Sequence, residues 1–106
     1  MKLNLVAHLD VVAFADREAV FDTADRLMAH LVDQGIDSPA VGVSIEGDGA
    51  LVEVEYRIQA RDAAEAMRRG TVDLKAALAA VGWTQSSTAP TTVPAGWAGE
   101  PVVAAA

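Results

Sequence analysis

Apolar and polar residues alternate along residues 3–11, where every odd position is apolar. A period of two is typical of a β-strand that buries one face and exposes the other. The polar positions between the apolar ones are Asn4, His8 and Asp10, and only Val6 departs from the pattern. The pattern therefore predicts a first strand with one face in the core and one polar face.

The next apolar residues recur three and four positions apart, which predicts an amphipathic helix. Asp16 suits the N-cap of this helix, because its carboxylate can accept hydrogen bonds from the free amides of the first turn. Gly35 followed by Ile36 suits a left-handed cap at the other end. The predicted buried stripe consists of Val20, Phe21, Ala24, Leu27, Met28, Leu31 and Val32.

Residues 41–46 and 51–60 alternate again and predict two further strands. Between them stands Gly47-Asp48-Gly49, and glycine supplies the positive φ that a short hairpin connection needs. The alternation places Val52, Val54, Tyr56 and Ile58 on one face of the third strand. We therefore expect a β-hairpin between the two helices.

A second helix is predicted from Asp62 to Gly82, opening with the capping-box pattern Asp62-Ala63-Ala64-Glu65. Its predicted buried stripe includes Gly70, which costs roughly 1 kcal/mol relative to alanine inside a helix. Gly70 either marks a close approach to a neighbouring element or is a tolerated small residue. The other members of the stripe are Ala63, Ala66, Met67, Leu74, Ala77, Leu78 and Val81.

The two halves of the chain repeat each other at an offset of 47, with Gly35 matching Gly82 and Leu31 matching Leu78. This arrangement resembles the ferredoxin-like, or split βαβ, fold in general and no specific family. The resemblance implies an α+β protein of βαββα order, a two-layer sandwich with an antiparallel sheet and two helices on one face. It also implies a short fourth strand after Trp83, although residues 84–88 are polar there.

The C-terminal part has a different composition, with three prolines, many small residues and one charge. We interpret residues 1–84 as a ferredoxin-like domain and residues 85–106 as a Pro/Ala/Thr-rich tail, which cannot build a core of its own. The tail is either a flexible spacer or is anchored by Val93 and Trp97 on this subunit or on a neighbour.

Composition limits the classes of function. The chain has 106 residues, no cysteine and a net charge of −7. The missing thiols exclude disulfide frameworks and cysteine-ligated metals. The spread-out negative charge disfavours binding to nucleic acid or to anionic membranes. No run approaches a membrane span, so we expect a cytoplasmic protein, and the Arg, Ala, Asp and Val content is typical of a GC-rich bacterial genome.

The polar face of the predicted sheet is the candidate site for chemistry. His8, Asp10 and Glu55 share this face and are candidates for metal binding or acid/base catalysis. A solvated sheet face would carry the same residue types for solubility. The charged residues Glu53, Glu55 and Arg57 also weigh against a dimeric barrel in which two such sheets pack around an apolar pocket.

The hypothesis that we favour is a non-enzymatic interaction or assembly module of bacterial or bacteriophage origin that uses no cofactor. It would associate with itself or with another protein, with Trp83, Val93 and Trp97 as partner-binding residues, because a sheet edge is open and the tail could add to it as a strand. One alternative is a small metal-dependent enzyme or binder that uses the polar sheet face. Another is a small-ligand sensor.

Overall fold

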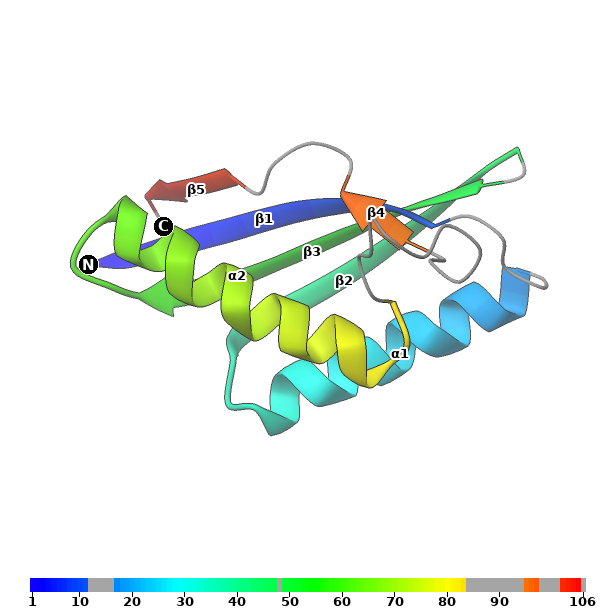
Figure 1. Ribbon diagram of the computed structural model, residues 1–106, viewed down its shortest axis with the longest axis horizontal. Helices are drawn as coiled ribbons and strands as arrows, with labels where there is room; N and C mark the ends of the chain where they lie inside the picture. The colour runs from blue at the N-terminus through cyan, green and yellow to red at the C-terminus, as the bar shows by residue number, and fades with distance from the viewer. Residues whose placement is uncertain (12–16, 48, 84–94, 98–101, 106) are drawn as a thin grey trace.

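The computed structural model of the chain describes residues 1–11, 17–47, 49–83, 95–97 and 102–105. The elements follow the predicted βαββα order, and two short strands come after them (Figure 1). Their bounds are β1 (Lys2–Val11), α1 (Arg17–Asp33), β2 (Asp37–Glu46), β3 (Gly49–Gln59), α2 (Ala63–Ala80), β4 (Ala95–Trp97) and β5 (Val102–Ala105).

The sheet is antiparallel and has β3 in its middle, between β1 and β2. Both short strands pair with the other side of β1. Strand β4 pairs with residues 9–11 of β1, and β5 pairs with residues 3–6 of β1. Both helices cover one face of the sheet, α1 beside β2 and α2 nearer to β1 (Figure 1). The α+β sandwich is thus confirmed, with a topology that is roughly ferredoxin-like.

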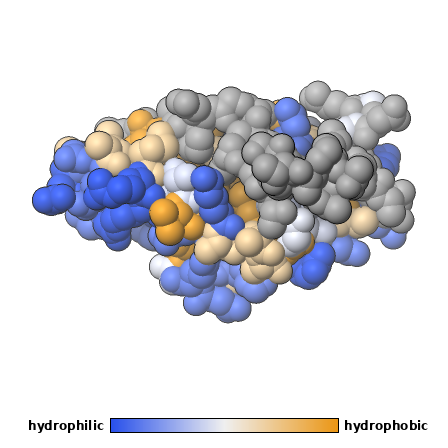
Figure 2. All heavy atoms as spheres, in the orientation of Figure 1, coloured by the Kyte–Doolittle hydropathy of each residue, from blue (hydrophilic) through white to orange (hydrophobic). Residues whose placement is uncertain are grey.

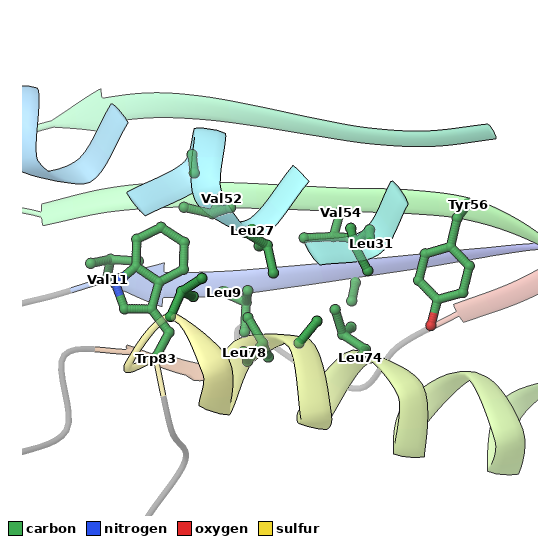
Figure 3. Packing of buried hydrophobic residues seen from close by; sticks show 14 of the residues in the cluster. Leu9, Val11, Leu27, Leu31, Val52, Val54, Tyr56, Leu74, Leu78 and Trp83 are labelled. Atoms are coloured by element: carbon green, nitrogen blue, oxygen red, sulfur yellow. The ribbon is translucent and has the colours of Figure 1, made fainter. Parts of the chain in front are cut away.

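The core lies between the helices and the sheet (Figure 3). Leu27 and Leu31 of α1 and Leu74 and Leu78 of α2 point at the strands, where the alternate residues of β1 and β3 meet them. Tyr56 is fully buried among them, as the alternation predicts. Within the described residues, neither helix is long and apolar enough to cross a membrane.

Both helices end in the same glycine motif. Gly35 and Gly82 have φ values of 76° and 83°. The amide of Ile36 donates to the Leu31 carbonyl at 3.1 Å, and the amide of Trp83 donates to the Leu78 carbonyl at 2.9 Å. These are the six-to-one hydrogen bonds of a Schellman cap, so the predicted helix ends are confirmed.

Gly70 marks a close approach, which decides between the two interpretations of this glycine. A Cβ atom placed there would lie 2.5 Å from Leu5 Cδ1 and 3.4 Å from the Tyr56 hydroxyl. That hydroxyl donates a hydrogen bond to the Gly70 carbonyl. The helix can pack this closely on β1 and β3 because residue 70 has no side chain.

The structure differs from the prediction at the start of β2 and in the exposure of three helical residues. Strand β2 begins four residues earlier than residue 41, with an irregular register between Asp37 and Ala40. The assignment of Phe21 and Val32 to the buried stripe of α1 was wrong, since their exposed fractions are 44% and 56%. Ala63, placed in the buried stripe of α2, is also exposed.

Candidate functional site

The polar face of the sheet carries the predicted chemistry-bearing residues, and the register of β1 and β3 decides which of them meet. His8 lies opposite Glu53, and His8 Nε2 is 3.0 Å from Glu53 Oε2. Both side chains are substantially exposed, at 39% and 52%. The pair is therefore a surface contact in a solvated setting, of the kind worth about 0–1 kcal/mol.

The other two candidates of this face do not join the pair. Asp10 lies opposite Leu51, and Glu55 lies opposite Val6, so each carboxylate has an apolar residue as its cross-strand neighbour. Among the described residues, no group of three His, Cys, Asp or Glu side chains is placed to hold a metal ion.

The predicted partner-binding residues lie in different settings. Trp83 belongs to the core cluster with an exposed fraction of 5%, and its ring stands beside Val11 and near Leu78 (Figure 3). The backbone of Trp97 is paired with Leu9 of β1. Val93 lies outside the described residues.

The outer edge of β1 is occupied by the chain's own C-terminal strands. The three residues of β4 and the four residues of β5 pair with two separate stretches of this edge. Val103 of β5 is partly buried against both clusters of the core. An edge that the βαββα order leaves open is therefore covered from within the same chain.

The opposite edge of the sheet is the outer side of β2. Strand β2 is ten residues long and lies at the end of the strand order. Val41, Val43 and Ile45 alternate along it on the helix side and are only partly buried. An edge strand of this length presents a row of backbone amides and carbonyls that another strand can pair with.

An apolar side of α1 adjoins this edge, and the sequence did not distinguish it from the core. Phe21, Met28 and Val32 follow one another at helical spacing along one side of the buried stripe. We call these three residues the outer flank of α1. The right-handed β1–α1–β2 connection turns this flank away from α2, towards the outer side of β2.

One feature of the sequence indicated the outer flank, namely the width of the apolar stripe of α1. The apolar stripe assigned to α1 holds seven residues, and four of them, Val20, Ala24, Leu27 and Leu31, suffice to face the sheet. A stripe wider than its contact with the core leaves apolar residues over for a second surface.

Charge is distributed unevenly over the described surface. Arg61 and Arg69 flank Glu65 at the start of α2, with the Arg61 Nε to Glu65 Oε2 distance at 2.7 Å. Figure 2 shows a group of hydrophilic side chains at this end of the molecule. By contrast, residues 17–47 contain two arginines and six acidic residues, a net charge of −4.

Hydrogen bonds to Arg61 lower the pKa of Glu65, since its carboxylate accepts both from the Arg61 side chain and from the Arg61 backbone amide. Burial, together with the negative charge of Asp73, raises the pKa of Tyr56 well above its usual range. Both groups support α2 structurally, and neither lies on the polar sheet face.

Comparison with known proteins assigns no family, because neither the models of protein families nor the curated proteins give a match to this chain.

Proposed function

We propose that this chain is a non-enzymatic assembly module that associates with itself by exchanging its C-terminal strands. The observation that carries the proposal is the pairing of β4 and β5 with the outer edge of β1. Strand pairing uses backbone groups that are the same in every copy. The edge of β1 in one copy can therefore accept the strands of a second copy in the same register.

The length of the connection supports exchange. Residues 84–94 join the end of the α2 cap to β4, and when fully extended they span at most roughly 36–40 Å. The two shorter dimensions of the molecule, which separate copies packed side by side, are 26 and 22 Å. The connection is thus long enough for the strands to reach the β1 edge of a copy packed alongside.

The shortness of the two separate C-terminal strands also supports exchange. Strand β3 pairs with β1 from Lys2 to Val11, whereas β4 and β5 contribute only three and four residues each. Strands this short are individually weak and can detach without unfolding the rest of the sheet. Pairing within one chain is favoured at low protein concentration. The fraction of strands that pair between chains increases as the concentration rises.

Light scattering on the full chain and on a truncation after Ser87 tests the proposal. We expect the full chain to form dimers or larger assemblies with increasing concentration, and the truncated chain to stay monomeric. Circular dichroism on both proteins checks that the truncation still folds. If both proteins fold and both are monomeric at every concentration, the proposal is wrong.

A further inference from the structure

The described core consists of two clusters, and Val103 of β5 packs against both of them. The smaller cluster joins β1, β3 and α2 and consists of Leu3, Ile58, Ala60 and Ala66. The exposed fractions of these four residues are 8% or less, whereas Val103 is only partly buried. Strand β5 therefore contributes an apolar side chain to the cover of the core as well as backbone pairing.

The register of the sheet places Val103 opposite Leu5, and opposite residues of paired strands share a face. Leu5 is fully buried beside Gly70 of α2, where an added Cβ atom would lie 2.5 Å from Leu5 Cδ1. Because α2 already contacts the sheet here, it cannot move inwards to replace Val103. Detachment of β5 would therefore expose apolar surface beside Leu5 to water, which costs free energy.

The backbone pairing of β5 is weak by itself, since the strand is only four residues long. The apolar contact of Val103 is thus a large part of what opposes the detachment of this strand. Strand β4 pairs with a separate stretch of β1, and the free energies of opening two separate stretches add. A change at Val103 therefore alters the opening of both C-terminal strands together, whatever β4 contributes.

We infer that Val103 anchors β5 on the edge of β1, and that its release controls how fast the C-terminal strands open for exchange between copies. The second part of this inference rests on the proposed function, whereas the opening itself can be measured within one chain. Val103 makes the same contact on the β1 edge of its own copy and on that of a partner. The anchor therefore sets the rate of exchange and not the final proportion of exchanged strands.

Hydrogen exchange of the full chain at low concentration tests the anchor. Val103→Thr keeps the branched shape of the side chain and replaces a methyl group by a hydroxyl group. The amides of residues 3–6 that face β5 should exchange at least about fivefold faster in this variant. Amides of the same stretch that face β3 should be unaffected. The matched control is Val72→Thr, at a valine of α2 that is 63% exposed, and it should leave both sets unchanged.

The rate of strand exchange gives a second measurement. Assemblies of ¹⁵N-labelled and unlabelled full chains are mixed, and native mass spectrometry follows the appearance of species that contain both. Mixed species should appear about fivefold faster with Val103→Thr than with the parent, in proportion to the faster opening. Their final proportion should equal that of the parent.

The outcomes separate the anchor from the proposed function. Equal protection of residues 3–6 in the parent and in Val103→Thr would overturn the anchor, and so would an equal loss of protection in Val72→Thr. Faster opening in Val103→Thr without mixed species in any of the proteins would support the anchor and contradict strand exchange. Faster opening together with mixed species that form at the parent's rate would show that Val103 does not control exchange.

Discussion

Gly70 is a residue at which helix propensity and packing oppose each other. Alanine would favour the helix by about 1 kcal/mol. Its Cβ, however, would lie 2.5 Å from Leu5 Cδ1, and Leu5 is fully buried and has little room to move. Overpacking a core by one methyl group costs typically about 1–3 kcal/mol.

Gly70→Ala should therefore lower the free energy of unfolding by up to about 2 kcal/mol, because the overpacking outweighs the helix gain. Urea denaturation measures the change. Leu5→Val is the matched second mutation, since it shortens the side chain that the new methyl group meets. It should cost less in the Gly70→Ala background than in the parent, and a Gly70→Ala protein more stable than the parent would contradict the close contact.

Tyr56 supports the same contact from β3. Tyr56→Phe removes the hydrogen bond to the Gly70 carbonyl and should lower the free energy of unfolding by about 1 kcal/mol. Because folding raises the pKa of Tyr56, the folded state keeps the phenol proton that the unfolded state loses above about pH 10.

The stability of the parent should accordingly fall as pH rises above about 10, and Tyr56→Phe should flatten that part of the profile. Denaturation curves at a series of alkaline pH values give the comparison. Identical slopes in the two proteins would show that Tyr56 does not titrate with folding.

At the scale of elements, the start of α2 is held by two carboxylates, each of which accepts a hydrogen bond from a different backbone amide. Asp62 Oδ1 accepts from the Glu65 amide at 2.8 Å, and Glu65 Oε1 accepts from the Arg61 amide at 3.3 Å. Asp62→Ala should cost about 1 kcal/mol of unfolding free energy. Glu65→Gln keeps the shape of the side chain and removes its charge.

The lowered pKa of Glu65 predicts the sign of an acid effect. The stabilisation by its carboxylate is present above the unfolded value of about 4.3 and is lost as pH falls through the lower folded value. Between about pH 5 and 3, the parent should therefore lose more stability than Glu65→Gln. A steeper loss in Glu65→Gln would mean that the carboxylate does not support the helix end.

The elements also show which parts of the fold a sequence can predict. Both helix ends were predictable because a glycine followed by an apolar residue encodes the Schellman cap locally, at Gly35 and at Gly82. The exposure of Phe21 and Val32 was not, because helical spacing gives the side of a helix and not what covers it.

The pairing of the C-terminal strands also could not be predicted from their own residues. Strands β4 and β5 are short and consist mainly of Ala, Val and Gly, so their own residues carry little preference for a particular partner. They are fixed by the free edge of β1, which is a property of the assembled sheet. Of the candidate site, the sequence could place His8 and Glu53 on one face, but the contact between them depends on the strand register.

At the scale of the whole molecule, the sheet has two edges in different states. The β1 edge is covered by the chain's own C-terminal strands, and the β2 edge carries no strand from the described residues. The proposed exchange of strands between copies concerns the first edge.

Strand exchange is tested most directly by a disulfide between two copies. Val6 and Val102 are register partners in β1 and β5, and the chain has no cysteine of its own. Chains carrying only Val6→Cys are mixed with chains carrying only Val102→Cys under oxidising conditions. In the control mixture, chains carrying Val72→Cys, on the exposed side of α2, replace those carrying Val6→Cys.

The account predicts a mixed disulfide in the first mixture, increasing with protein concentration, and little in the control. Mass spectrometry of the oxidised mixtures, separated without reductant, measures both. A mixed disulfide that forms no more readily with Val6→Cys than with Val72→Cys would contradict strand exchange.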